Sequence, residues 1–326
     1  MNDKDIFFSA IIPVYNRPQE VDELLESLVK QKYRNFEVVI IEDGSTDDCK
    51  SVVEKYTDQL DIQYFFKENS GQGFSRNYGF ERARGDYFVV FDSDCLIPDQ
   101  YFEEVNSRLQ ENWLDAYGGP DKEHETFSTI QKAISYSMTS LFTTGGIRGR
   151  KEHAGKFHPR SFNMGTSRKV YETVGGYIIT RMGEDIEYSI RIIKNGFDVG
   201  LISNAFVYHK RRTNLRQFYK QLHFFGRARI NIGRFFPKEI KLVHFFPAFF
   251  FLSLVSLPLW YFIYEPVFWL GAGIFAFYYL ILFFDALRAT RSLGVSILAM
   301  VTSTIQLSAY AIGFLTEGRR KLFEKG

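Results

Sequence analysis

The chain has 326 residues, enough for one large domain or two smaller units, and its formal net charge is +2. Its two cysteines, Cys49 and Cys95, exclude a disulfide framework and a paired-cysteine metal site. The average composition hides a division, because residues 242–316 are too apolar for a soluble surface and are predicted to lie in lipid. The charged side chains in that segment are Glu265, Asp285, Arg288 and Arg291.

The N-terminus does not resemble a secretory leader. Asp3 and Asp5 stand where a leader is basic, and Pro13 interrupts the short apolar run. We therefore expect the polar part of the chain to stay in the cytosol. Together with the apolar C-terminal segment, this predicts a multi-pass protein of the cell membrane with a cytoplasmic N-terminal domain.

The first hundred residues alternate between strand-like and helix-like patterns. Helical spacing of apolar side chains marks residues 18–31 and 73–84. This alternation predicts a parallel sheet covered by helices on both faces, whose ligands bind beyond the carboxyl ends of the strands. That rule directs attention to Asn16 and to residues 42–45 and 92–94. Apolar runs of strand length occupy residues 6–14, 36–41, 62–66 and 87–91.

Asp92-Ser93-Asp94 directly follows the fourth apolar run and is the centre of the predicted site. In an extended segment alternate side chains lie on one face, so both carboxylates would share a Mg²⁺ or Mn²⁺ ion with diphosphate oxygens. The cation would neutralise the charge that builds up on a departing nucleoside diphosphate. The alternative is a polar turn with solvated carboxylates, which is common for an isolated Asp-x-Asp.

Two further segments are candidates for nucleotide contacts. In Glu42-Asp43-Gly44-Ser45 a carboxylate would accept the imide N–H of a uracil base; the alternative is an ordinary turn. Residues 69–73 and the following Arg76 open a helix, where Arg76 and the backbone N–H groups near Gly71 would face an anionic diphosphate. The alternative there is a flexible helix entry with a solvated Arg76.

Two later residues complete the predicted chemistry. Asp185, in Gly183-Glu184-Asp185, begins a helix and suits the general base that removes the proton of an acceptor hydroxyl. The alternative is a carboxylate that only favours the helix dipole. His209 follows an apolar strand end and is a candidate third metal ligand, although a lone histidine is more often structural.

The order of these motifs resembles glycosyltransferase family 2 over roughly residues 6–212. The motifs that carry the resemblance are Ile12-Pro13-Val14-Tyr15-Asn16, Glu42-Asp43-Gly44-Ser45, Asn69-x-Gly71 with Arg76-Asn77-x-Gly79, Asp92-x-Asp94 and Gly183-Glu184-Asp185. The resemblance implies the GT-A fold, an α/β architecture with a Rossmann-like mixed sheet flanked by helices. It divides residues 1–212 into a nucleotide-binding half, about 1–95, and an acceptor half, about 96–212, which includes the basic, glycine-containing stretch 145–150.

The resemblance also implies roles for individual residues. It places Tyr15 and Asp43 in the nucleoside pocket, Arg76 near the base or diphosphate, Asp92 and Asp94 on nucleotide and metal, and Asp185 as catalytic base. Gly165, in Asn163-Met164-Gly165-Thr166-Ser167, would lie under the donor sugar. The remaining donor-contacting positions that the motifs imply are Pro13, Asn16, Glu42, Gly71 and Ser93.

The resemblance predicts a metal-dependent, inverting transferase that uses a UDP- or GDP-linked sugar. The Gln-x-x-Arg-Trp motif of processive synthases is absent after residue 185, and His209-Lys210-Arg211-Arg212 stands there instead, so we expect single-sugar transfer. The expected acceptor is a glycan or lipid-linked molecule at the membrane, in envelope polysaccharide or glycolipid biosynthesis. The alternatives are a polyprenyl-phosphate sugar synthase and a non-catalytic nucleotide-binding membrane protein.

The C-terminal third is predicted to meet the membrane in stages. Residues 213–241 form a basic amphipathic helix that would lie on anionic lipid, and nucleic acid is not an expected partner. Within 242–316, segments 242–264, 266–284 and 294–316 are each about long enough to cross ~30 Å of hydrocarbon. Three crossings would put the basic tail, residues 317–326, outside, against the usual bias of positive charge, so both two and three crossings stay open.

Overall fold

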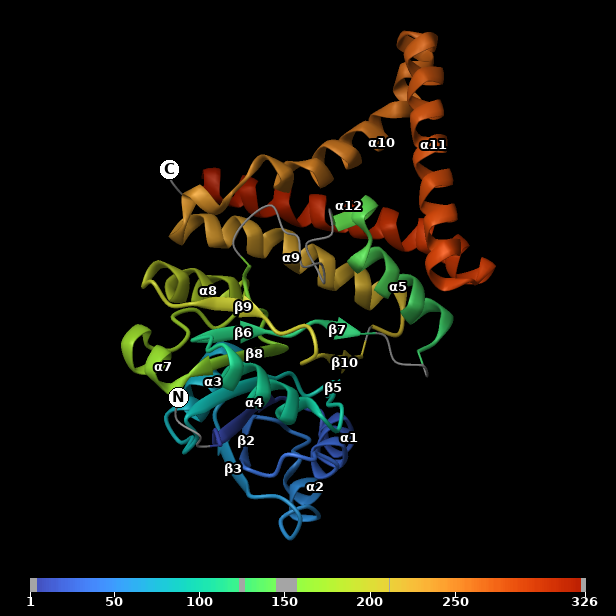
Figure 1. Ribbon diagram of the computed structural model, residues 1–326. Coiled ribbons are helices and arrows are strands. Elements are labelled where there is room, and N and C mark those ends of the chain that lie inside the picture. The colour runs from blue at the N-terminus through green and yellow to red at the C-terminus, as the bar shows by residue number, and fades with distance from the viewer. Residues whose placement is uncertain (1–4, 123–126, 145–156, 211, 324–326) are drawn as a thin grey trace. The chain divides into compact units, whose positions relative to one another are not determined.

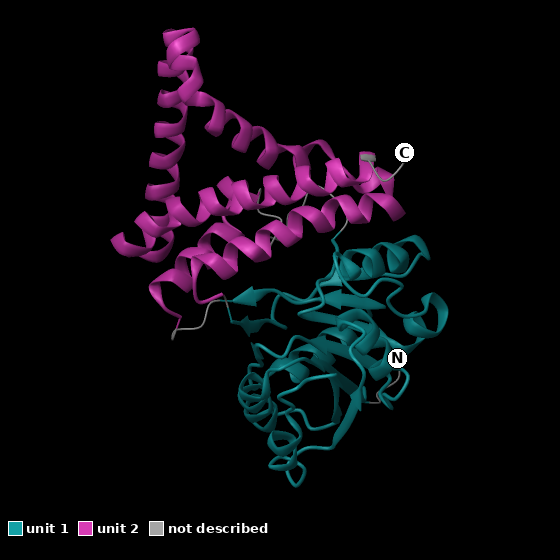
Figure 2. Ribbon diagram, turned by 180° about the vertical axis from the view of Figure 1, so that it is seen from behind, with its two compact units in different colours: residues 1–124, 151–210 teal, residues 125–150, 211–326 magenta. Residues whose placement is uncertain are grey.

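The structure, a computed structural model, describes residues 5–122, 127–144, 157–210 and 212–323. The chain forms two compact units (Figure 2). The sheet unit contains Met1–His124 and Lys151–Lys210, and the helical unit contains Glu125–Arg150 and Arg211–Gly326. The stretch 145–150 and Arg211, both used in the sequence interpretation, lie outside the described residues.

A seven-stranded mixed sheet forms the centre of the sheet unit (Figure 1). The four N-terminal strands pair in parallel in the order β3-β2-β1-β4, and β8 then runs antiparallel to both of its neighbours, β4 and β6. The mixed sheet that the sequence predicted is therefore confirmed. Its strands, in spatial order, are β3 (Ile62–Lys67), β2 (Phe36–Asp43), β1 (Phe8–Val14), β4 (Tyr87–Phe91), β8 (Asn163–Ser167), β6 (Ala116–Gly118) and β9 (Val199–Leu201).

Helices cover both faces of this sheet because side chains of the buried strands alternate between two apolar clusters. Phe8, Ala10 and Ile12 of β1 pack with α1 (Pro18–Val29), α2 (Lys50–Glu54) and α4 (Tyr101–Glu111). Ile11 points into the other cluster, which Phe80, Val170 and Ile192 complete. Those three residues come from α3 (Gln72–Phe80), α7 (Arg168–Val174) and α8 (Glu184–Lys194).

A second, three-stranded sheet lies beyond the end of β4. It consists of β5 (Cys95–Leu96), β10 (Val207–His209) and β7 (Asp121–Lys122), with β10 in the middle. The antiparallel register pairs His209 with Cys95 and Tyr208 with Leu96. Because β5 begins directly after the Asp-x-Asp segment, this pairing brings His209 next to it.

The helical unit contains long helices and two short 3₁₀ turns (Figure 1). By length and composition alone, Leu242–Ile263, Glu265–Thr290 and Leu293–Leu322 could each cross a membrane. Pro258 does not interrupt its helix, and Tyr264 alone separates α10 from α11. The elements are α5 (Thr129–Thr139), α6 (Leu141–Thr144), α9 (Leu215–Phe235), η1 (Pro237–Glu239), η2 (Leu242–Phe245), α10 (Phe246–Ile263), α11 (Glu265–Thr290) and α12 (Leu293–Phe323).

The helical unit corrects one expectation from the sequence. Ile134 and Met138 of α5 share an apolar cluster with Phe218 and Leu222 of α9 and with Ala309 of α12. Helix α5 therefore belongs with the C-terminal helices, and not with the acceptor half to which its sequence position assigned it. The same cluster covers Phe218 and Leu222 of α9 with protein, and the expected place of residues 213–241 at a lipid surface stays a prediction.

Candidate active site

The end of β1 is tied to the loop after β2 by Asn16. Its backbone has a positive φ of 53°, and its side-chain Oδ1 accepts hydrogen bonds from the backbone N–H groups of Thr46 (2.9 Å) and Asp47 (3.1 Å). Its own N–H donates to Ser45 Oγ at 2.7 Å. Asn16 thus fixes the strand-end loops, while the neighbouring Tyr15 is 52% exposed and available to a ligand.

Glu42 and Asp43 both organise the loops around them. Glu42 is fully buried and accepts hydrogen bonds from Ser45 Oγ and from the Cys49 N–H (2.8 Å). Asp43 accepts from Lys67 Nζ (2.6 Å) and from the N–H groups of Ser70 (2.9 Å) and Gly71 (2.8 Å). Burial alone would raise the pKa of Asp43, but these hydrogen bonds outweigh it and the pKa lies below its usual value. A direct nucleotide contact by either carboxylate stays a prediction.

The loop that opens α3 is packed against residues 179–181, so it is more ordered than a flexible helix entry. Gly71 has a φ of +86°, and a Cβ there would lie 2.5 Å from Thr180 Oγ1. The Gly73 N–H donates to the Thr180 carbonyl at 3.1 Å. Only glycine combines this backbone conformation with so close an approach.

Arg76 connects the two acidic motifs of the predicted site. Its Nη2 lies 2.9 Å from Asp92 Oδ1, and its Nη1 lies 3.2 Å from Glu184 Oε1. Its side chain is only 1% exposed, and its guanidinium lies over the ring of Tyr177 at 5.4 Å. Arg76 therefore acts on the site through Asp92 and Glu184, and its predicted contact with the base or diphosphate remains a prediction.

The Asp-x-Asp segment forms a turn, which corrects the extended conformation expected from the sequence. The Cys95 N–H donates to the Asp92 carbonyl at 3.1 Å. The two carboxylates consequently have different partners. Asp92 binds Arg76, whereas Asp94 Oδ2 lies 2.7 Å from Arg17 Nη1 and Asp94 Oδ1 lies 3.0 Å from His209 Nε2. Ser93 between them is buried.

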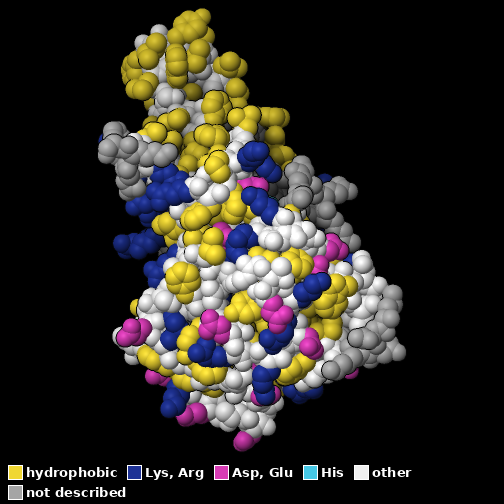
Figure 3. Space-filling view, turned by 90° about the vertical axis from the view of Figure 1, so that its left-hand side faces the viewer, with side chains coloured by type: hydrophobic (Ala, Val, Ile, Leu, Met, Phe, Trp, Pro, Cys, Tyr) yellow, Lys and Arg dark blue, Asp and Glu magenta, His cyan; other side chains and the backbone are white. Residues whose placement is uncertain are grey.

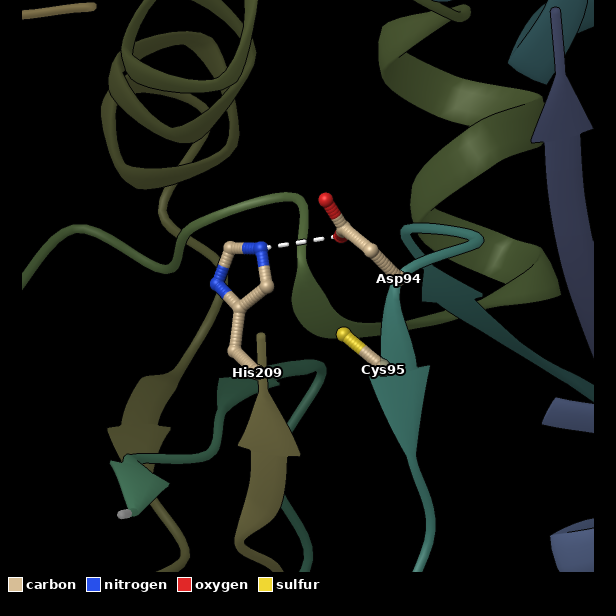
Figure 4. A group of neighbouring side chains, drawn as sticks. All are labelled: Asp94, Cys95 and His209. Carbon is tan, nitrogen blue, oxygen red and sulfur yellow. Dashed lines mark ion pairs between the residues drawn. The ribbon is translucent and has the colours of Figure 1, made fainter. Parts of the chain in front are cut away.

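Asp94, Cys95 and His209 offer ligand atoms that all lie within 4.8 Å of one another, and Figure 4 shows these side chains converging. His209 is held in place by stacking on Phe162, with ring centroids 5.1 Å apart. Burial raises the pKa of the Cys95 thiol well above its usual range, and Mg²⁺ and Mn²⁺ prefer oxygen ligands to a neutral thiol. Asp94 and His209 therefore fit a divalent cation. Asp92 is not part of this cluster, and its role as a ligand stays a prediction.

Asp185 lies in the first turn of α8. Helix α8 begins after Gly183, which has a φ of +97°. Asp185 Oδ1 accepts from the N–H of Ile186 at 2.8 Å, and Oδ2 lies 3.4 Å from Arg160 Nη1. Its side chain is 17% exposed, whereas that of the adjacent Glu184 is 5% exposed and faces Arg76. Asp185 is thus the more exposed of the two carboxylates in this motif, and its role as the base stays a prediction.

The sequence profile of glycosyl transferase family 2 matches residues 9–175, half of the chain and most of the sheet unit. The chain belongs to this family. An uncharacterized glycosyltransferase from Rickettsia bellii is 38% identical over 109 residues, which cover 33% of this chain and 16% of the relative. The poly(ribitol-phosphate) β-N-acetylglucosaminyltransferase TarS from Staphylococcus aureus is 35% identical over 112 residues, 33% of this chain and 20% of TarS.

Solved structures share the fold over nearly the whole chain. The mannosyltransferase PcManGT from Pyrobaculum calidifontis, in complex with GDP-Man and Mn²⁺, has a TM-score of 0.60 at 17% identity, covering 99% of this chain and 89% of that one. Residues 1–349 of S. aureus TarS, in complex with UDP, have a TM-score of 0.50 at 18% identity, covering 96% and 91%. The GT-A fold implied by the sequence motifs is thereby confirmed for this family 2 glycosyltransferase.

Gly165 has a structural reason to be glycine in this glycosyltransferase. A Cβ at this position of β8 would lie 2.0 Å from Cε1 of Tyr117, a buried residue of β6. The ring of Tyr117 fills the space beside the Gly165 backbone and its hydroxyl pairs with that of Tyr101 at 3.0 Å. Close packing of the core thus accounts for Gly165, and its predicted place under the donor sugar remains a prediction.

The candidate site residues chosen from the sequence left out three residues that shape the site. Arg17 pairs with Asp94 across 77 positions of sequence, and no local pattern marks it. Asn77 binds the backbone of Tyr177 twice, donating at 2.8 Å and accepting at 2.7 Å. Glu184 could have been found, because a buried carboxylate beside a predicted catalytic one needs a cation, and Arg76 was already a candidate.

Proposed function

We propose that this family 2 glycosyltransferase moves one sugar from a nucleoside-diphosphate sugar to a hydroxyl of a membrane-proximal or lipid-linked acceptor, with inversion and with a divalent metal. In this proposal the sheet unit catalyses the transfer, and the apolar helices of the helical unit attach the protein to the membrane. The work of such an enzyme is to stabilise the leaving diphosphate and to activate the attacking hydroxyl.

The single observation that carries the proposal is the double contact of Arg76. The buried guanidinium holds Asp92, in the Asp-x-Asp turn, and Glu184, next to Asp185. The Arg76 guanidinium thereby holds together two motifs that are separated by some ninety residues of sequence. A site that must place a diphosphate near one motif and an acceptor near the other requires such a rigid connection.

Asp94 and His209 would hold the metal. The bound ion supplies positive charge that stabilises the departing diphosphate. Arg17 lies against Asp94 at 2.7 Å and is a further cation on this side of the site. Asp43 already accepts hydrogen bonds from Lys67 and from the N–H groups of Ser70 and Gly71, and these bonds order the loop. The exposed side chain of Tyr15 is then the surface that the nucleoside contacts.

Asp185 accepts the proton of the acceptor hydroxyl. The hydroxyl oxygen then forms a bond to the anomeric carbon of the donor sugar, while the bond between that carbon and the diphosphate oxygen breaks. Attack from the face opposite the leaving group inverts the anomeric configuration. Arg160, 3.4 Å from Asp185, orients the carboxylate for this step.

The donor class is supported by the solved relatives. PcManGT binds GDP-Man with Mn²⁺, and TarS binds UDP. We therefore propose a UDP- or GDP-linked sugar as donor and Mn²⁺ or Mg²⁺ as the metal. The C-terminal helices, which are long and apolar enough to cross a membrane, favour an acceptor at the bilayer surface, in envelope polysaccharide or glycolipid assembly on the cytoplasmic side.

The full chain, purified in detergent, should be screened against UDP- and GDP-linked sugars for protection from thermal unfolding, with Mn²⁺ and with a chelator. A donor at a hundred times its dissociation constant stabilises the folded state by about 2.7 kcal/mol. We expect protection by one donor class, and only with the metal. Protection by none of them would contradict the proposal. Product analysis with the donor found then separates transfer to a glycan hydroxyl from transfer to a polyprenyl phosphate.

A further inference from the structure

The three apolar helices of the helical unit differ in how much protein covers them. In the most apolar windows of Leu242–Ile263 and Glu265–Thr290, 11% and 6% of the residues are buried, against 50% for Leu293–Leu322. A helix that crosses a bilayer within a small protein presents most of its surface to lipid, and the first two helices leave most of their surface uncovered by protein. Half of the corresponding residues of α12 are buried by other parts of the protein, so the helices that cover it bear on whether it crosses.

Helix α9 lies parallel to the second half of α12. A Cβ on Gly226 would lie 2.1 Å from the Tyr310 carbonyl oxygen, and one on Gly313 would lie 2.0 Å from that of His223, so the two backbones touch at glycines. Further along, Arg227 Nε lies 2.9 Å from Glu317 Oε2, and Lys321 donates to the Ile230 carbonyl. The two helices therefore form one closely packed pair.

Helix α5 accompanies the first half of α12. Thr302 Oγ1 donates to the Ala133 carbonyl at 3.1 Å, and Ile134 and Met138 pack with Ala309. Several polar side chains of α12 are buried along this contact. A helix that faces lipid would not need polar side chains there. They are Ser296, Thr302, Ser303 and Gln306.

The companions of α12 exclude it from hydrocarbon. A charged side chain near the centre of a bilayer is costly, and α9 carries basic residues in every part of its length. Because α9 is packed along the second half of α12, that half can enter the hydrocarbon only if α9 enters with it. The basic residues of α9 are Arg216, Lys220, Arg227, Arg229 and Arg234.

The α10–α11 hairpin has the opposite character. The two helices meet at Tyr264, and their joined end points away from α9 and α12 within the helical unit (Figures 1 and 2). Hydrophobic side chains cover that end, with Lys and Arg gathered below it (Figure 3). Glu265 stands at the turn, where Trp269 Nε1 donates to it at 2.8 Å. Trp and Tyr side chains are enriched at the membrane–water interface, and Tyr264 and Trp269 stand on either side of Glu265 in the sequence.

We infer that the α10–α11 hairpin alone crosses the bilayer, twice, and that α12 lies in the plane of the membrane surface with α9. Two crossings return the chain to the side it left. The basic end of α12, Arg319-Arg320-Lys321, is then on the side of the sheet unit, where positive charge is favoured. The contact between Lys321 and Ile230 requires this, because Ile230 precedes both crossings. The inference does not depend on the proposed chemistry.

The test uses variants of the full chain that each carry one added cysteine, and a membrane-impermeant maleimide applied to intact and to permeabilised cells. Asp58→Cys reports the sheet unit, Glu265→Cys the hairpin turn, and Leu322→Cys the end of α12; all three positions are exposed. The native Cys49 and Cys95 are buried, so the unmodified chain gives the background.

We expect Asp58→Cys and Leu322→Cys to react from the same side of the membrane and Glu265→Cys to react from the opposite side. Reaction of Leu322→Cys from the side opposite to Asp58→Cys would show that α12 crosses and would overturn the inference. Reaction of all three from one side would contradict the double crossing. Catalytic activity is not needed for this readout, so its result is independent of the proposed function.

Discussion

Arg76 Nη1 lies 3.2 Å from Glu184 Oε1, and both side chains are almost completely buried although 108 positions separate them in sequence. Burial raises the pKa of Glu184 above its usual value and the nearby Asp185 adds to the rise, whereas Arg76 opposes it. The ion pair therefore favours the charged form of this carboxylate, whereas burial disfavours it.

Arg76→Met should destabilise the sheet unit by about 3–5 kcal/mol at pH 8, because it leaves Glu184 buried without its cation. The pKa of Glu184 would rise further. Glu184 would then bind a proton more readily in the folded state than in the unfolded state. The loss of stability caused by Arg76→Met should therefore shrink as the pH falls through the raised pKa of Glu184 in the folded state. Thermal unfolding of the full chain at pH 8 and pH 5 measures both effects. The double variant Arg76→Met/Glu184→Gln should recover part of the stability; fully additive losses would contradict the pairing.

His209→Ala should weaken Mn²⁺ binding by at least ~10-fold, and Asp94→Asn should do the same, because each removes one of the two side chains that fit the cation. Cys95→Ser is the matched control, and it should leave metal affinity unchanged because the neighbouring thiol is not a ligand. Calorimetric titration with Mn²⁺ in the presence of UDP or GDP measures the affinities. Equal effects of all three substitutions, or full activity with a chelator, would rule out the metal site as described.

Asp43→Asn should destabilise the protein by about 1–3 kcal/mol near pH 7, because it weakens the hydrogen bonds from Lys67, Ser70 and Gly71. The pKa of Asp43 is lowered in the folded state. Its contribution is therefore present above the unfolded value of about 3.9 and is lost as the pH falls through the folded pKa. The difference in unfolding free energy between Asp43→Asn and the unmodified protein should therefore become smaller at acidic pH. Unfolding curves between pH 7 and pH 3 test this, with the exposed Asp58→Asn as control.

Gly165→Ala should destabilise the core by about 1–3 kcal/mol, because the added Cβ meets the ring of Tyr117 at 2.0 Å. Gly200→Ala in β9 is the matched control: its nearest neighbour is the Leu114 side-chain end, 2.9 Å away, which can move more easily. Melting temperature and donor KM should be measured together. An unchanged melting temperature with a raised donor KM would instead place Gly165 under the donor sugar.

The strands and the order of the motifs could be predicted from sequence because they are local. Continuous apolar runs marked β1 to β4, and polar motifs directly followed them. The conformation of Asp92-Ser93-Asp94 could not be predicted, because the Cys95 N–H and the partners Arg76, Arg17 and His209 decide it. A strand pairing across more than a hundred residues brings His209 to Asp94.

The apolar face of α9 shows a second limit. Amphipathic spacing identifies a face that must be covered, but it does not say whether lipid or protein covers it. In the structure Phe218 and Leu222 meet Ile134, Met138 and Ala309, from segments far away in the sequence. Because protein covers these side chains of α9, α9 and α12 form one packed pair within the helical unit.

Asp185 carries the central claim, that this carboxylate removes the proton of the acceptor hydroxyl. Asp185→Asn keeps the shape of the side chain and its hydrogen bond to the Ile186 N–H while removing basicity. The measurement pairs donor binding, by calorimetry, with turnover, using the donor and acceptor found by screening. We predict unchanged donor affinity and a turnover lower by ~10²–10⁴-fold, the usual contribution of a general base. Unchanged turnover with unchanged binding would show that Asp185 only stabilises the start of α8.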